Sequence, residues 1–327
     1  MMIETKSWKK VFVDMFLNDN PEKKMEGRQR LNLDDESLIY ICKLWDGIFV
    51  WGNDVHSRHI SYPYDGTDQH PFTVINVCHE GRCEIEMQDD IYIYMTPGLL
   101  NVNNRVPKDG YHYPTGSYEG LEIAFDMTVL KEHMPVELTS FGLTLEELED
   151  FLERGNGNCT AHVSDAAMQQ SKVLYENLKA GGGCITDYRF WTVSILYYLK
   201  NGEMSEVKNR SLITKGQRRI AIEAEQILTE NFRRHYTVEE LSRRYGVSPS
   251  ALKKYFEAVF GLPVSYYVRE KKMNKAKQML STTCTSVGEI AAECGYENQG
   301  KFGSAFKTYT GVSPLEYRRR HKIIREE

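Results

Sequence analysis

The chain has 327 residues, enough for two domains with separate cores, and its 41% hydrophobic and 27% charged residues are typical of a soluble globular protein rather than a fibrous or disordered one. The net charge of −5 is unevenly distributed, because residues 1–214 carry 20 Lys and Arg against 33 Asp and Glu, whereas residues 215–327 carry 21 against 13. We therefore expect the carboxy-terminal part to attract phosphates and the acidic remainder to make no contact with nucleic acid.

No apolar run approaches the length that crosses a bilayer, and the apolar patch at residues 11–17 is too short and too charged at its flanks for a signal peptide. We therefore expect a cytoplasmic protein. The cysteines are odd in number, and we interpret them as reduced, structural thiols, with a redox sensor as the alternative. They are Cys42, Cys78, Cys83, Cys159, Cys184, Cys284 and Cys294.

Residues 62–125 predict a series of short β-strands. The segments 71–81, 82–89, 91–104 and 120–127 place β-branched and aromatic residues in near-alternation, and Gly, Pro and Asp residues interrupt them. Short antiparallel strands at this spacing indicate a small sandwich or barrel.

A barrel of this kind has an interior lined by inward-facing side chains, where a ligand can bind. For each candidate the alternative is a core or surface position, and Arg105 is the one that could meet an anionic group. The candidate ligand-binding residues are Trp45, Trp51, Phe72, Tyr92, Tyr94, Arg105, His112 and Tyr113. Because the histidines His70, His79 and His112 are isolated, we predict no metal and no cofactor.

Two helices are predicted after the strands, at residues 164–178 and 185–199, on either side of a turn at 180–183. The second helix carries an apolar stripe of Tyr188, Trp191, Ile195 and Tyr198 at spacings of three and four. This stripe packs either on the chain's own barrel or on a second copy. Residues 201–214 are polar and predict a linker, and residues 215–234 predict a helix that opens the next domain.

Two segments of the carboxy-terminal part repeat one layout, a short helix, a turn with Gly and a second helix with Phe on its buried face. These are residues 237–261, with Gly246 and Phe256, and residues 281–320, with Gly295 and Phe302. Both predict a helix-turn-helix, although one such stretch alone could be an ordinary helical hairpin. The helix-compatible residues 263–280 between them span ~27 Å, a little less than one ~34 Å turn of DNA.

Polar side chains lie between the buried positions of each second helix and could reach base edges or phosphates from a major groove. The predicted DNA-binding residues are Ser250, Lys253, Lys254, Gln299, Lys301, Ser304 and Lys307.

The carboxy-terminal third resembles the DNA-binding domain of the AraC/XylS family of bacterial transcription regulators. The segment GYENQGKFGSAFKTYTGVSPLEYR is similar to the family signature over nearly its full length, with departures at Gly300 and Lys301 that bear on DNA sequence preference. The resemblance implies an α+β, multidomain chain. Its parts are a cupin-like sensor domain at 1–160, a helical dimerisation segment at 161–200, a linker at 201–214 and an all-α domain with two helix-turn-helix motifs at 215–327.

The same resemblance implies a sequence-specific transcription regulator, most simply an activator of nearby genes that responds to a small molecule. The implied partners are double-stranded DNA, a small-molecule effector, a second copy of the chain and RNA polymerase, with no membrane. An alternative is a ligand-independent dimeric regulator or repressor whose barrel serves only assembly. A second alternative is an enzyme fused to the DNA-binding domain, but no activated nucleophile or phosphate loop supports catalysis.

Overall fold

The computed structural model describes residues 27–61, 72–86, 90–103, 110–154, 159–202 and 212–321. The chain divides into two compact units, residues 1–212 and residues 213–327, and each is described by itself. Within the described ranges, no helix combines the length and the apolar composition that a membrane span requires.

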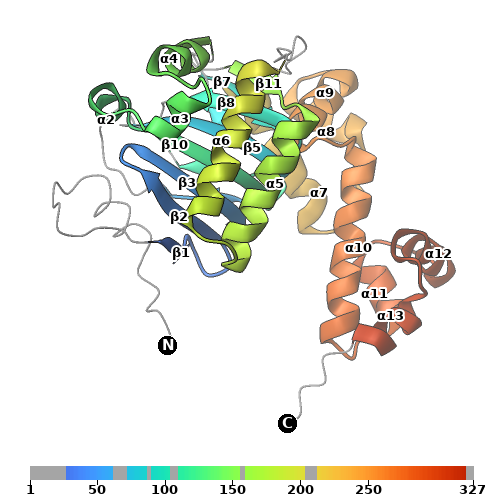
Figure 1. Cartoon of the computed structure of the whole chain (residues 1–327). Helices are drawn as coiled ribbons and strands as arrows, with labels where there is room; N and C mark the ends of the chain where they lie inside the picture. The colour runs from blue at the N-terminus through green and yellow to red at the C-terminus, as the bar shows by residue number, and fades with distance from the viewer. Residues whose placement is uncertain are drawn as a thin grey trace. The chain divides into compact units, whose positions relative to one another are not determined.

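The first unit is built on a seven-stranded antiparallel sheet in the order β1-β2-β3-β10-β5-β8-β11 (Figure 1). Two short ladders stand apart from this sheet. One pairs β6 with β7, and the other pairs β4 with β9. The strands of the large sheet are β1 (Arg28–Asn32), β2 (Leu38–Trp45), β3 (Ile48–Val55), β5 (Thr73–Gly81), β8 (Leu99–Asn103), β10 (Tyr118–Phe125) and β11 (Cys159–His162). The ladder strands are β4 (His59–Ile60), β6 (Cys83–Glu86), β7 (Ile91–Met95) and β9 (Tyr111–His112).

The predicted closed barrel is wrong in this structure. Among the described residues, β1 and β11 are the two edges of the large sheet and do not pair with each other, and the short ladders do not join it by hydrogen bonds. A barrel requires a continuous ring of strand pairs, whereas β4 and β9 contribute only two residues each. The amino-terminal unit is therefore a mixed α/β unit with an open sheet.

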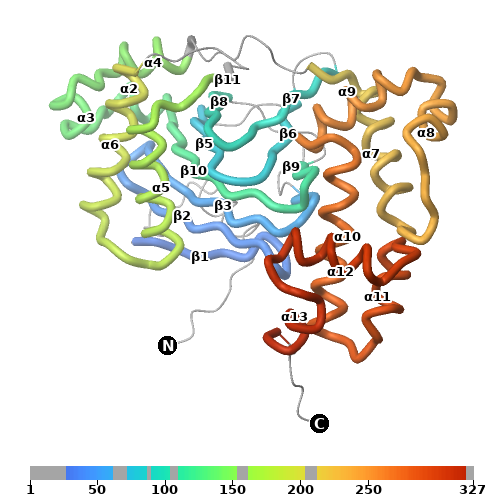
Figure 2. The backbone as a smooth tube through the Cα atoms, turned by 90° about the vertical axis from the view of Figure 1, so that its right-hand side faces the viewer, coloured from blue at the N-terminus to red at the C-terminus, as the bar shows by residue number. Residues whose placement is uncertain are grey.

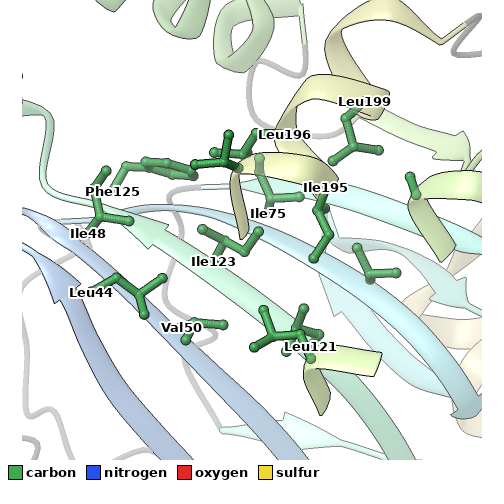
Figure 3. Close-up of a cluster of buried hydrophobic side chains, with 14 of the residues drawn as sticks. Leu44, Ile48, Val50, Ile75, Leu121, Ile123, Phe125, Ile195, Leu196 and Leu199 are labelled. Atoms are coloured by element: carbon green, nitrogen blue, oxygen red, sulfur yellow. The ribbon is translucent and has the colours of Figure 1, made fainter. Parts of the chain in front are cut away.

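One face of the sheet, the helix-covered face, packs against α5 (Asp165–Ala180) and α6 (Ile185–Asn201). Both helices were predicted from the sequence, and each ends within two residues of the expected position. Ser164 caps α5 and Gly181 ends it in the left-handed region. Figure 3 shows aliphatic side chains of the sheet, such as Ile75 and Ile123, meeting Ile195 and Leu199 of α6.

Three short helices extend the helix-covered face and contribute Leu130, Leu138 and Leu148 to the same core. Asp126 begins the first of them, because its carboxylate accepts hydrogen bonds from the N–H groups of Thr128 and Val129. The helices are α2 (Met127–Glu132), α3 (Val136–Ser140) and α4 (Leu145–Arg154).

The other side of the sheet, the strand-covered face, is covered by the short ladders instead of helices (Figure 2). Ile60 of β4, Cys83 of β6 and Met95 of β7 join side chains of the large sheet in a second buried cluster. The sheet therefore has a core on both faces.

The second unit is all-helical after the short strand β12 (Ile213–Thr214). A long helix, α10, connects the bundle of α7–α9 to the bundle of α11–α13 (Figure 1). The helices are α7 (Lys215–Glu230), α8 (Val238–Tyr245), α9 (Pro249–Phe260), α10 (Val264–Thr282), α11 (Val287–Glu293), α12 (Gln299–Thr310) and α13 (Pro314–His321). α7 is four residues shorter than predicted and ends at Glu230.

Candidate nucleic-acid interface

The first helix pair of the second unit consists of α8 and α9, and side chains cap both helices. The Thr237 hydroxyl accepts from the Glu240 N–H, and the Glu240 carboxylate accepts from the Thr237 N–H in return. α8 ends at Gly246, whose φ of 65° lies in the left-handed region. Ser248 then accepts from the Ala251 N–H and begins α9, so the turn between the helices is short and defined at both ends.

The second helix pair, α11 and α12, is built in the same way. Ser286 and Glu289 form a capping box at the start of α11. At the start of α12, Asn298 Oδ1 accepts from the N–H of Gly300 at 2.7 Å and from the N–H of Lys301 at 3.2 Å. These two bonds fix the first turn of α12, where predicted DNA contacts begin.

The segment between α7 and α8 contacts the turn of the second helix pair. Gly295 has a φ of 72°, and a Cβ there would lie 2.0 Å from the Phe232 carbonyl oxygen, so no other residue fits without movement. His235 Nε2 lies 3.0 Å from the Gly295 carbonyl, and Arg233 pairs with Glu293. The two helix pairs are therefore held together by this contact as well as by α10.

Helix α9 buries one side and exposes the other. Leu252 and Phe256 are buried, while the predicted DNA-binding residues Ser250, Lys253 and Lys254 are all exposed. The structure therefore places these three side chains together on one free helix face.

Helix α12 repeats this arrangement, with Phe302 and Phe306 fully buried. The exposed residues include all four predicted on this helix, Gln299, Lys301, Ser304 and Lys307. The Gln299 amide oxygen reaches back toward α11, 3.2 Å from where a Cβ on Gly288 would stand. Gln299 would have to turn outward to meet a base, whereas the other three need no change of direction.

Sequence reasoning missed Glu257, which is exposed on α9, four residues after Lys253 and three after Lys254. Positions at these spacings share a helix face. A carboxylate there can accept a hydrogen bond from cytosine, so an acidic residue belongs among the candidates beside the lysines. The residues predicted from the sequence were lysine, serine and glutamine, so an acidic side chain was left out.

The predicted ligand-binding residues separate into groups. Trp51, Phe72 and Tyr113 lie together in the buried cluster of the strand-covered face. Trp45 belongs instead to the core under the helices, so it cannot share a site with them.

The remaining ligand candidates lie elsewhere. Strand alternation turns Tyr92 and Tyr94 away from the buried Met95, and the Tyr94 hydroxyl donates to Glu84 on the neighbouring strand at 2.8 Å. His112 is half-buried in β9, with its ring centroid 4.7 Å from that of His59. Arg105, like His70, lies outside the described residues.

The apolar stripe of α6 faces the sheet. Tyr188 is 3% exposed and Ile195 is fully buried within one chain, so neither offers surface to a second copy. Trp191 is partly buried against the same core, and Tyr198 is 40% exposed. The exposed apolar side chains of α6 are instead Ile185 at its start and Phe190, Tyr197 and Tyr198 further along.

Four of the cysteine thiols are buried and stay protonated near neutral pH. Burial raises the pKa of Cys42 and of Cys294 to about 11, that of Cys78 to about 12, and that of Cys83 well above its ordinary value. Thiols in this state react slowly, as structural cysteines do. Among the described residues, no three His, Cys, Asp or Glu side chains are grouped so that they could hold a metal ion.

In a comparison with known protein families, the family described as "Helix-turn-helix domain" matches residues 241–320. The uncharacterized HTH-type transcriptional regulator YdiP of Escherichia coli K12 is 31% identical over 157 residues, which cover 46% of this chain and 49% of YdiP. The HTH-type transcriptional activator RhaR of Klebsiella pneumoniae subsp. pneumoniae is 28% identical over 95 residues, 29% of this chain and 34% of RhaR.

Among solved structures, a transcriptional regulator from Chromobacterium violaceum, described as an AraC-type DNA-binding domain-containing protein, is similar to this chain at 25% identity. The match covers 33% of this chain and 97% of that one, with a TM-score of 0.30. This chain spans half or less of the length of the two curated relatives.

Proposed function

We propose that this chain, which belongs to the AraC/XylS family of transcription regulators through its carboxy-terminal domain, binds specific double-stranded DNA with two helix-turn-helix motifs, α8–α9 and α11–α12. One observation carries the proposal. Both α9 and α12 bury aromatic side chains on one side and expose lysine and serine on the other. A helix with such a face enters a major groove, and the 19 residues of α10 separate the two motifs by ~28 Å, close to one ~34 Å turn of DNA.

In this proposal, exposed side chains of α9 and α12 read base edges, and Lys307 contacts a phosphate. Lysine can donate to guanine, serine to several bases, and Gln299 to adenine once it turns outward. The proposed base contacts are Ser250, Lys253, Lys254, Gln299, Lys301 and Ser304.

Replacement of Lys301 by Ala tests this arrangement in a fluorescence anisotropy titration at fixed salt. The DNA is a site selected from a random-sequence pool and a scrambled version of it. A base contact costs about 1–3 kcal/mol on the selected site and little on the scrambled one. Lys131→Ala removes the same charge from the amino-terminal unit and serves as the control. Equal weakening on both DNAs would make Lys301 a phosphate contact instead.

We further propose that the amino-terminal unit receives a small-molecule effector and that the protein activates transcription with RNA polymerase. The relative RhaR is named a transcriptional activator, which supports the activation part of this proposal. Residues 210–327 alone should then bind specific DNA but ignore the effector. If the isolated fragment and the full chain respond identically to every small molecule, the alternative of a ligand-independent regulator is favoured.

We also propose that α6 mediates dimerisation through its exposed apolar side chains Phe190, Tyr197 and Tyr198. Pairing raises DNA affinity through effective concentration. Tyr197→Asp should give monomers in sedimentation while leaving the fold intact, because this side chain is 44% exposed. A monomeric wild-type protein at micromolar concentration would rule out this surface as the dimer contact.

A further inference from the structure

A row of polar side chains crosses the strand-covered face of the sheet, within an otherwise apolar cluster. Glu122 of β10 lies opposite Trp51 of β3 on one side and opposite Asn76 of β5 on the other, and Asn76 lies opposite Asn101 of β8. Polar groups in such a place cost free energy unless they are hydrogen-bonded. The row therefore demands either a structural role or a binding role.

Glu122 is the centre of the row, and only N–H donors surround it. Trp51 Nε1 donates to Oε2 at 2.7 Å, while Asn53 Nδ2 and Asn76 Nδ2 donate to Oε1 at 2.8 and 3.1 Å. The Asn76 amide is held in this orientation because its oxygen accepts from the Tyr118 hydroxyl at 2.5 Å. Donors alone on a carboxyl group match its ionised form.

The helix-covered face shows how this protein holds carboxylates that only stabilise the fold. There Asp54 and Glu119 both contact the Lys179 ammonium, at 3.1 and 2.8 Å. Within the described ranges, by contrast, Glu122 makes no ion pair with any Lys, Arg or His. An ionised carboxylate without a cation is a costly arrangement in a low-dielectric site.

Glu122 differs from its hydrogen-bond donors in accessibility. Trp51, Asn53 and Asn76 are buried, whereas Glu122 keeps part of its surface accessible, although burial is still strong enough to raise the pKa of its carboxyl group to about 7. Its titratable neighbours, Cys83 from β6 together with Tyr113 and Tyr118, have pKa values raised well above their usual range by burial, so they stay neutral.

The aromatic rings on this face pack closely around the polar row, and of those named here only Phe49 is partly exposed. The Tyr113 and Tyr118 rings lie 5.3 Å apart, the Phe49 and Phe72 rings lie 5.6 Å apart edge to face, and Trp51 joins them in the same cluster. Gly120 makes the placement of Tyr118 possible, because a Cβ there would stand 2.5 Å from the Tyr118 hydroxyl. Aromatic faces attract cations through their quadrupoles.

We propose that the strand-covered face binds an organic ammonium ion, whose positive charge pairs with the Glu122 carboxylate and whose apolar body packs on the aromatic side chains around Trp51. This inference rests on the proposed function in that the ammonium ion is the effector, and it names the chemical class of that effector. Among the described residues, Lys179 of the helix-covered face has no counterpart beside Glu122, and in this proposal the ligand supplies the cation.

The test compares amines with neutral molecules of the same shape on the full chain at pH 8. The probes are butylamine, phenethylamine and choline, paired with butanol, phenethyl alcohol and dimethylbutanol. Isothermal titration calorimetry should find at least one amine bound about tenfold or more tighter than its neutral counterpart, since a hydrogen bond to a charged group contributes about 1.5–3 kcal/mol. If the neutral molecules bind as tightly, or if no amine binds at millimolar concentration, the proposal is overturned.

Variants locate the binding. Glu122→Gln should abolish the preference for the amine, while Glu80→Gln, an exposed carboxylate on β5, should keep it. Trp51→Phe keeps an aromatic ring but removes one donor, so it should reduce affinity for amines and neutral molecules by different factors. Because the amine comparison is made first on the wild-type protein, it stands even if Glu122→Gln does not fold. An amine preference that persists in a folded Glu122→Gln variant would show that the amine does not bind at Glu122.

A DNA titration in parallel separates this inference from the proposed function. Specific DNA binding without any amine preference would defeat the ammonium site and leave the regulator intact. Amine binding without specific DNA binding would do the reverse.

Discussion

The two faces of the central sheet hold their buried polar groups in opposite ways. On the helix-covered face, Asp54 and Glu119 share the Lys179 cation, and His79 Nε2 lies 2.7 Å from the Ser171 hydroxyl of α5. On the strand-covered face, Glu122 accepts from three donors and pairs with no cation among the described residues. The difference separates carboxylates whose charge is balanced within the chain from one whose charge, in our proposal, is balanced by a bound cation.

The same difference appears in two buried groups that titrate in opposite directions. Burial lowers the pKa of His79 to about 4, with help from Lys172, and burial raises the pKa of Glu122 to about 7 against the hydrogen bonds from Trp51 and Asn53. Between these two pKa values, the folded protein therefore holds both groups uncharged. Their effects on stability run against each other as pH changes, so each is best seen when the other is removed.

The largest effect is expected from the apolar part of the helix-covered face. Phe125 is fully buried there, so Phe125→Ala should lower the free energy of unfolding by about 3–5 kcal/mol through lost burial and a cavity. Phe141→Ala is the matched control, because Phe141 is 55% exposed and its loss should cost less than about 0.5 kcal/mol. Urea unfolding followed by circular dichroism measures both. Equal losses would mean that this core does not stabilise the unit as described.

The Glu122 carboxyl group on the strand-covered face should make the free energy of unfolding depend on pH. Because the pKa of Glu122 is about 7 when folded, against an ordinary value of 4.5, its contribution is fully present below pH 4.5 and is lost as pH rises through 7. The Glu122→Gln variant does not suffer this loss. Its free energy of unfolding, compared with that of the wild type, should therefore rise by about 3 kcal/mol from pH 4.5 to 7.5, at about 1.4 kcal/mol per pKa unit. Urea midpoints across this range measure it, with Glu80→Gln as the control. A relative stability that does not change with pH would contradict the burial of this carboxyl group.

His79 should give a change of similar size and opposite sign. Its folded pKa of about 4 lies below the ordinary 6.5, so its contribution is present above pH 6.5 and is lost as pH falls through 4. His79→Gln should therefore gain stability relative to wild type, by up to about 3 kcal/mol, on going from pH 7 to pH 4. The same unfolding experiment decides it, and a relative stability that falls on acidification would place a charged imidazole in the native state.

The helices of the carboxy-terminal domain could be predicted because their signals are local. Thr237 with Glu240 and Ser286 with Glu289 lie three residues apart, and a turn glycine lies one residue after the end of α8 and two residues after the end of α11. Strands β2 and β3 gave no such signal. The segment 38–45 is buried on both faces of the sheet, so its apolar residues form a run without alternation. The sequence interpretation therefore began its strands too late, at residue 62.

The candidate sites differ in the same respect. The exposed residues of α9 and α12 could be predicted from helical spacing, since the buried Phe residues define the opposite face. The Glu122 row could not. Its three donors lie 71, 69 and 46 residues away along the chain and meet only through the pairing of β3, β10 and β5. The order of strands in the sheet, which propensity does not specify, brings them together.

The smallest expected effect tests the contact between His79 and α5. Ser171 is fully buried and provides the hydrogen-bond partner of His79 Nε2, while among the described residues His79 Nδ1 has none. Ser171→Ala should lower the free energy of unfolding at pH 7 by about 1 kcal/mol, because it leaves a buried ring nitrogen unpaired. Ser194→Ala on α6 is the control, since its hydroxyl donates only to the Phe190 carbonyl one turn earlier on an exposed surface. A double-mutant cycle with His79→Phe then isolates the pair. A coupling energy of about 1 kcal/mol would show that this hydrogen bond stabilises the packing of α5 on the sheet. Additive losses would show that the bond contributes nothing and that apolar packing alone holds the helix.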